Sequence, residues 1–163
     1  MKNYLLNKLA KFLARPAVAN YLIERSYNTP YRHLDGYMNR YWLFNPYEEM
    51  GQLRRFKWCP FSIRVHHILR ADNADHQHDH PWDARTFILR GGYCEKREDK
   101  EFLRWAGDTA TVLFNEYHHI SHVTPGGVFT LFVTFKYRGT WGFKVDGVKV
   151  PWKKYIAEHP ERS

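Results

Sequence analysis

The sequence predicts an all-β domain, a sandwich or barrel of about eight strands. Runs rich in Val, Ile, Phe, Thr and Tyr recur between residues 61 and 150 and are separated by short turns. The pair Asp146-Gly147 lies between two such runs and is typical of a tight hairpin turn. The segment "TPGG" at 124–127 reverses the chain before the longest apolar run. Strands of this length and spacing favour an antiparallel β-architecture over a helical one.

The elements follow from the same patterns. Residues 3–14 place leucines and a phenylalanine at helical spacing before Pro16, which predicts a short helix, and a second short helix is expected after Pro151. An edge strand is expected near 41–44, and the main strands at 61–70, 84–90, 92–98, 102–106, 109–114, 118–123, 128–137, 141–145 and 148–152. We therefore expect three parts: an N-terminal helix and irregular edge segment (1–58), a barrel (59–150) and a C-terminal helical tail (151–163).

Composition limits the class of protein. A chain of 163 residues with 44% hydrophobic residues can form one domain with a real core. The net charge of +8 favours anionic partners such as nucleic acid, phosphorylated metabolites, carboxylates or an acidic membrane surface, and charge alone does not choose among them. The basic residues are interspersed with acidic ones and no nucleic-acid-binding motif occurs, which favours an ordinary basic surface over dedicated nucleic-acid binding. Cys59 and Cys94 form no CxxC pair, which argues against a disulfide framework or a thiolate zinc site.

The same sequence suggests where the protein works. It contains no apolar run of roughly twenty residues and no signal-peptide pattern, so we expect no membrane association and a cytoplasmic location. The apolar stripe of the N-terminal helix is expected to pack on its own domain or on a partner subunit, and the second arrangement would give a homodimer.

Two groups of histidines indicate a metal site. His76, His78 and His80 alternate along the chain, so their side chains would project to the same side of an extended segment. Residues 118–122 supply three more histidines, about forty residues later. A His-x-His pair joined by a third histidine from another strand is a common set of nitrogen ligands that leaves open coordination positions.

These residues resemble the two motifs of the cupin superfamily. His78-Asp-His80 followed by Gly91-Gly92 is similar to the first motif, although the motif's upstream glycine is absent. The spacing of the second motif is matched by five residues: Gly107, Leu113, Asn115, His118 and His122. Of these, only Gly107 and His118 are the residues that the family has at those positions. The resemblance covers about residues 60–145. It implies a single cupin-type double-stranded β-helix, or jelly-roll barrel, with His78, His80 and His118 as metal ligands.

Short phrases strengthen the resemblance without giving a reaction. "HDHPW", "ILRGGY" and "WGF" also look like segments of small single-domain cupins found in bacteriophage and bacterial genomes. Such a resemblance informs on the fold and leaves the reaction open.

The chain departs from the family where cupins place a glutamate ligand. That position falls at Ala84 or Arg85, and neither side chain can bind a cation. Three outcomes stay open. The site is a three-histidine site, similar to that of the thiol dioxygenases; or a bulge at Pro81-Trp82 brings Asp83 into it; or no metal binds.

Further residues are candidates for binding a substrate. Arg64 and His66 share one face of the predicted strand 61–70, and the planar guanidinium of Arg64 is suited to a carboxylate or phosphate. Arg85 is a similar candidate because it lies near the missing glutamate. His122 is a candidate to hydrogen-bond a metal ligand from behind.

The resulting hypothesis is a metal-dependent cupin that acts on a small polar or anionic metabolite. The leading form is a dioxygenase with Fe(II) at the three-histidine site, with Zn, Mn or Ni as alternative metals. The alternatives are a non-catalytic cupin that binds or sequesters a nucleotide or sugar phosphate, a sugar isomerase or epimerase, and a structural module for assembly.

Overall fold

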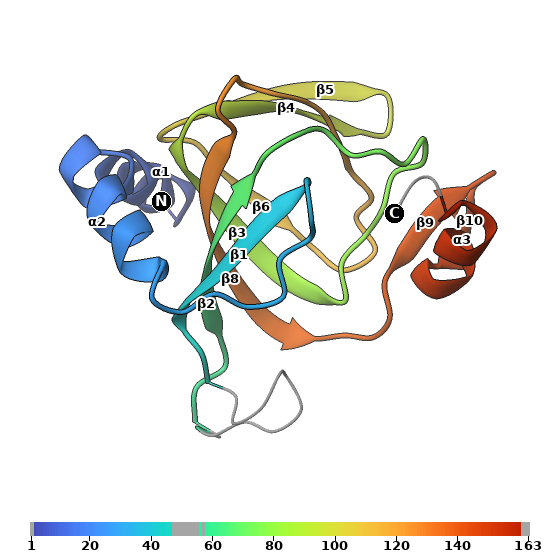
Figure 1. The fold of residues 1–163 in the computed structure, drawn as a ribbon, viewed down its shortest axis with the longest axis horizontal. Coiled ribbons are helices and arrows are strands. Elements are labelled where there is room, and N and C mark those ends of the chain that lie inside the picture. The colour runs from blue at the N-terminus through green and yellow to red at the C-terminus, as the bar shows by residue number, and fades with distance from the viewer. Residues whose placement is uncertain (1, 47–55, 57, 161–163) are drawn as a thin grey trace.

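The computed structural model describes residues 2–46, 56 and 58–160. Within these ranges the chain forms ten strands and three helices (Figure 1). The elements in order are α1 (Lys2–Leu13), α2 (Pro16–Ser26), β1 (Met38–Phe44), β2 (Ser62–Ile68), β3 (Trp82–Arg90), β4 (Gly92–Arg97), β5 (Lys100–Trp105), β6 (Thr109–Val112), β7 (His119–Val123), β8 (Val128–Tyr137), β9 (Gly142–Val145), β10 (Val148–Pro151) and α3 (Trp152–Glu158). The all-β prediction, with a short helix near each end, is confirmed.

Two antiparallel sheets form the body of the domain. The larger sheet has the strand order β1-β2-β8-β3-β6, and the smaller has the order β5-β4-β7. Their inner faces meet in an apolar cluster that takes residues from both sheets: Ile68, Ile88, Tyr93, Ile120 and Val128. Because burial of apolar side chains is the dominant favourable term in folding, this cluster holds one end of the sheet pair together and leaves the other end for polar side chains.

The helices α1 and α2 cover the outer face of the larger sheet (Figure 1). Ala10, Ala19 and Ile23 pack there against sheet residues such as Leu89 and Phe129. The sequence pattern does not predict the second helix, because Pro16 interrupts the apolar spacing. Proline is tolerated at the first position of a helix, where its missing N–H needs no partner, and α2 begins at that residue.

No helix within the described residues has the length and apolar character needed to cross a membrane. The division of the chain at residues 58/59 and 150/151 stays a prediction.

The C-terminal hairpin and helix form a separate layer at the side of the domain (Figure 1). Strands β9 and β10 pair through the predicted turn, where Asp146 and Gly147 both have positive φ (49° and 78°). Tyr155 of α3 is fully buried against Phe143 and Ala74. This layer therefore packs on the chain segment that carries the first group of histidines.

The buried face under the helices gives a direct test of the core. Leu89→Ala removes a side chain that is 1% exposed, so we expect it to lower the free energy of unfolding by roughly 2–5 kcal/mol through lost burial and a residual cavity. Urea denaturation measures this difference. Leu103→Ala is the matched control, since Leu103 is 68% exposed, and a comparable loss in both variants would contradict the assigned core.

Candidate metal centre

Three histidines from separate parts of the chain converge on the inner side of the sheets. Ring nitrogens of His78, His80 and His118 all lie within 4.8 Å of one another. The Nε2 atoms of His80 and His118 are 2.8 Å apart. Two ligands bound about 2.1 Å from one ion at right angles would be separated by about 3 Å, so this spacing fits a shared divalent cation. The structure thus brings together the three residues that the sequence predicts as ligands.

The segment 76–80 is held in place from both sides. It is not a regular strand: His78 alone forms β-bridges, to His118 on one side and to Phe143 on the other. The backbone N–H of His78 donates to the carbonyl of His118 at 2.9 Å, and the reverse bond has the same length. The buried carboxylate of Asp79 accepts from the Gly142 N–H (2.8 Å) and from Nζ of Lys149 (2.6 Å). The backbone of the first histidine group is therefore fixed by hydrogen bonds to both neighbours.

A buried glutamate orients His118. Nδ1 of His118 donates to Oε1 of Glu95 at 2.9 Å, and Glu95 is only 1% exposed. Two arginines donate to the same carboxylate, Arg97 through Nη2 at 2.8 Å and Arg104 through Nε at 3.1 Å. Burial opposes the charge on Glu95, but the bond from His118 and the nearby Arg97 lower its pKa to about 2. The ionised carboxylate fixes the tautomer of His118 and leaves Nε2 free for a metal.

A second carboxylate lies beside His78. Oδ2 of Asp72 is 3.7 Å from Nδ1 of His78 and accepts a hydrogen bond from the backbone N–H of Ile120 at 2.8 Å. The hydroxyl of Tyr37 donates to Oδ1 of the same group. Burial opposes the charge on Asp72, but His78 and these donors together lower its pKa. Asp72 therefore faces the ring edge of His78 that carries Nδ1.

Burial disfavours the charged form of two of the three histidines. Desolvation lowers the pKa of His78 to about 4, partly offset by the Asp72 carboxylate. It lowers the pKa of His80 well below the usual value, with His118 and His78 adding to the effect. Neutral imidazole is the form that binds metals, so these rings are ready as ligands at neutral pH.

Arg64 and His66 lie on the same inner surface as the histidine cluster. Arg64 is 9% exposed, and its guanidinium carbon lies 4.6 Å from the ring centre of Trp42 and 4.8 Å from that of Trp82. Trp82 also neighbours His80, at 6.4 Å between ring centres. Nε of Arg64 is buried without a hydrogen-bond partner among the described residues, and no described carboxylate forms an ion pair with it.

Two candidates do not join the cluster. Arg85 faces outward on β3, where its Nη1 donates to Oγ1 of Thr109 at 3.1 Å. Asp83 also faces outward: its Oδ1 accepts from the Phe114 N–H at 3.2 Å, and its Oδ2 lies 3.2 Å from Nε of Arg138. Successive side chains of a strand point to opposite faces, so with the buried Ala84 inside, both neighbours are outside. The bulge expected to turn Asp83 inward does not do so.

The other three histidines of the two sequence groups are not members of the three-histidine cluster. His122 is exposed on β7, and the position expected for it, behind a ligand, is held by Glu95. His76 has its Nδ1 3.0 Å from the Tyr155 hydroxyl. Nδ1 of His119 is buried 3.8 Å from Oδ2 of Asp72, the oxygen that also lies near His78, so His119 is next to the cluster but is not one of its three members.

Glu95 and Asp72 were not predicted as site residues. The available signal for Glu95 is its spacing, since Tyr93 and Glu95 share the inner face of one strand and Arg97 follows two residues later. A glutamate on an inner face needs cationic or hydrogen-bonding partners, and such a residue is a candidate for a functional site. Asp72 lies in a loop, where sequence periodicity does not predict the direction in which a side chain points.

Comparisons with known proteins support the fold. A cupin 2 conserved barrel domain protein from Rhodopseudomonas palustris matches with a TM-score of 0.50 at 14% identity, covering 82% of each chain. A cupin-like protein from Thermotoga maritima matches with a TM-score of 0.47 at 13% identity, covering 77% of this chain and 90% of its own. KdgF from Halomonas sp. matches with a TM-score of 0.46 at 11% identity, covering 64% and 86% respectively. No protein-family model and no curated protein matched the sequence. The chain has the cupin fold, as predicted.

The lowered histidine pKa values make the metal-free protein sensitive to acid. Between pH 6.5 and about 4 the unfolded chain binds a proton at His78 that the folded chain does not, so the free energy of unfolding falls as the pH falls. A shift of this size corresponds to roughly 3 kcal/mol from His78 alone. Below the ordinary glutamate pKa of 4.5, Glu95 acts in the same direction, because the unfolded chain binds a proton there that the folded chain, with a Glu95 pKa of about 2, does not bind. Urea unfolding in chelator at a series of pH values measures the effect, and equal stability at pH 7 and pH 5 would contradict it.

Proposed function

We propose that the protein is a metal-dependent cupin enzyme that acts on a small anionic metabolite, with Fe(II) as the metal and a dioxygenase as the reaction class. The observation that carries the proposal is the convergence of His78, His80 and His118, with His78 and His80 held neutral by burial. Three neutral ligands leave a divalent ion its full charge and open positions, so the bound ion would supply Lewis-acid and redox chemistry to a substrate.

The residues around the cluster support a resident metal. Glu95 and Asp72 each face Nδ1 of one histidine, which is the arrangement that orients metal-bound imidazoles and raises their basicity. Without an ion, His80 and His118 would be left with Nε2 atoms at 2.8 Å, where one ring must donate to the other. A divalent cation satisfies both nitrogens at the same spacing.

Arg64 supports an anionic substrate. Its guanidinium is buried between aromatic rings and has no acidic partner among the described residues, an arrangement that is costly unless an anion completes it. Trp82 contacts both Arg64 and His80, so one small molecule could bring its acidic group to Arg64 and its reacting end to the histidines. In this role Arg64 binds and orients the substrate, and the aromatic rings exclude water from around it.

Metal content is the first test. Protein purified without chelator is expected to contain about one divalent ion per chain by elemental analysis. His118→Ala should lose at least ten times in metal affinity, since the site loses one of three ligands. His122→Ala is the matched control because it removes an exposed imidazole from β7, the strand that begins directly after His118. Equal metal content in the wild type and the His118→Ala variant would contradict the assignment.

Oxygen consumption tests the reaction. The Fe(II) protein is expected to take up O2 with at least one member of a panel of small carboxylates and phosphates. Arg64→Met should raise KM for that compound at least tenfold, or about 1.4 kcal/mol, because it removes the group that pairs with the anion. Arg90→Met, an exposed arginine at the end of β3, is the control. Turnover of neutral compounds only, or unchanged KM in Arg64→Met, would count against the anionic substrate.

One observation favours a second candidate, a cupin that binds its ligand without turnover. Ala84 stands where the cupin motif has a glutamate ligand, and no described carboxylate replaces it in the histidine cluster. The two candidates differ in one measurement. A binding protein would retain the anionic compound without consuming O2 or altering the compound, whether or not Fe(II) is present.

A further inference from the structure

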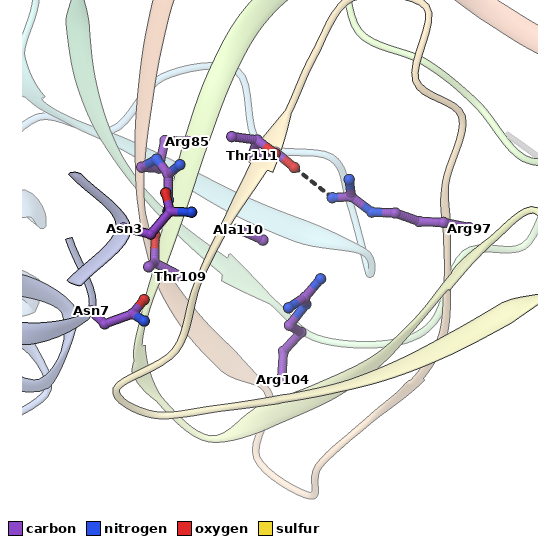
Figure 2. Close-up of a pocket in the computed structure, with 8 residues that line it drawn as sticks. All are labelled: Asn3, Asn7, Arg85, Arg97, Arg104, Thr109, Ala110 and Thr111. Atoms are coloured by element: carbon purple, nitrogen blue, oxygen red, sulfur yellow. Dashed lines mark hydrogen bonds between the residues drawn. The ribbon is translucent and has the colours of Figure 1, made fainter. Parts of the chain in front are cut away.

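A cavity separate from the histidine cluster lies under helix α1. It has a volume of about 390 Å³ and is bounded by β3 and β6 of the larger sheet, the β4–β5 hairpin of the smaller sheet and α1. Figure 2 shows its lining side chains, all polar except Ala110: Asn3, Asn7, Arg85, Arg97, Arg104, Thr109, Ala110 and Thr111. Three arginines thus reach one space from three different strands.

The positive charge in this cavity is only partly balanced. Arg97 and Arg104 share the buried carboxylate of Glu95, and Arg97 also lies 3.4 Å from the half-exposed Glu116. Arg85 has no ion pair with any described residue, and only its Nη1 is used, on Thr109. Arg104 donates to Glu95 only through Nε, so its two terminal nitrogens have no hydrogen bond to a described residue. Guanidinium donors on opposite walls therefore remain available.

We propose that this cavity binds the phosphate group of a small metabolite, at a site distinct from the histidine cluster. Guanidinium groups from different directions suit a tetrahedral oxyanion, whose oxygens also point in different directions, better than a planar carboxylate. The guanidinium groups of Arg85 and Arg104 contact the anion, and Arg97 closes the inner side, where its Nη2 donates to the carbonyl of Thr111 at 2.6 Å.

The rest of the lining indicates what carries the phosphate. A volume of about 390 Å³ falls in the lower part of the range of small-molecule sites, roughly 300–1,000 Å³, so more than a bare ion fits. Asn3 and Asn7 are one helical turn apart on α1 and offer amide donors and acceptors, and the two threonines add hydroxyls. This lining suits a phosphorylated polyhydroxy compound better than an apolar one.

Arg85, the proposed anion contact on β3, lies on the face of this strand opposite to the side chains that face the histidine cluster. Arg85 points outward while its neighbours Ala84 and Thr86 are buried on the inner face. None of the groups proposed to contact the anion is a histidine of the proposed metal centre, so phosphate binding here should survive removal of the metal.

The test is isothermal titration calorimetry at constant ionic strength with inorganic phosphate, glucose 6-phosphate and acetate. Both phosphates are expected to bind, the sugar phosphate more tightly, and acetate at least tenfold more weakly. Arg85→Gln should weaken phosphate binding at least tenfold, whereas Arg90→Gln, an exposed arginine on the same strand, should leave it unchanged. Binding of inorganic phosphate alone, with no gain from the sugar, would overturn the metabolite part of the proposal.

Further variants separate this site from the proposed active site. His80→Ala and Arg64→Met should keep phosphate binding, and loss of binding in either would place the anion inside the barrel and overturn the proposal. Asn7→Asp adds a negative charge to the cavity wall at an exposed helix position, so it should weaken phosphate binding without unfolding the protein. Unchanged affinity in both Arg85→Gln and Asn7→Asp would also overturn it.

Discussion

The buried carboxylate of Glu95 is the interaction on which both sites depend. It is 1% exposed and receives hydrogen bonds from His118, Arg97 and Arg104. A lone carboxylate in this place would be neutral or would destabilise the fold, so the three donors are required for the charge to persist. The same carboxylate orients a histidine on its inner side and holds two arginines of the phosphate cavity on its outer side. One charge thus organises both polar regions.

The histidine cluster also depends on the contacts that fix the loop 71–80 in place. Loops usually have freedom that a metal site cannot tolerate, because ligand nitrogens must be held close to their productive geometry. Here the loop lies between His118 and β9, and Asp79 anchors it to Lys149 and Gly142. The C-terminal hairpin and α3 therefore serve the site by fixing its first two histidines, which explains why Tyr155 is buried against this segment.

The inner surface between the two sheets has an apolar end and a polar end. An apolar cluster closes one end of the space between the sheets, and the histidines, Arg64 and His66 occupy the polar part. Burial of apolar side chains stabilises the apolar end. The buried polar side chains at the other end must be stabilised by hydrogen bonds, by ion pairs or by a bound ligand. Aromatic rings around Arg64 lower the cost of burying its charge through contact with their faces. The sequence pattern on β2, with Ser62, Arg64 and His66 on one face, is the local origin of this division.

Sequence reasoning predicted the strands well because alternation and turn residues act locally. It also predicted His78, His80 and His118 as one group, through their spacing and the resemblance to cupins. It could not predict the outward facing of Asp83 and Arg85, since a one-residue change of register reverses every side chain of a strand. Asp72 and Glu95 were missed because their roles depend on long-range contacts, to Ile120 and to His118, which the local pattern does not give.

Three histidines are proposed to hold one divalent ion. X-ray absorption spectroscopy of the Fe(II)-loaded protein tests it most directly, because the scattering identifies imidazole ligands and their distances. Three imidazole nitrogens at about 2.0–2.2 Å are expected, with the remaining ligands being oxygen atoms. A first shell with fewer than three imidazoles, or one in which iron is bound by oxygen atoms alone, would contradict it.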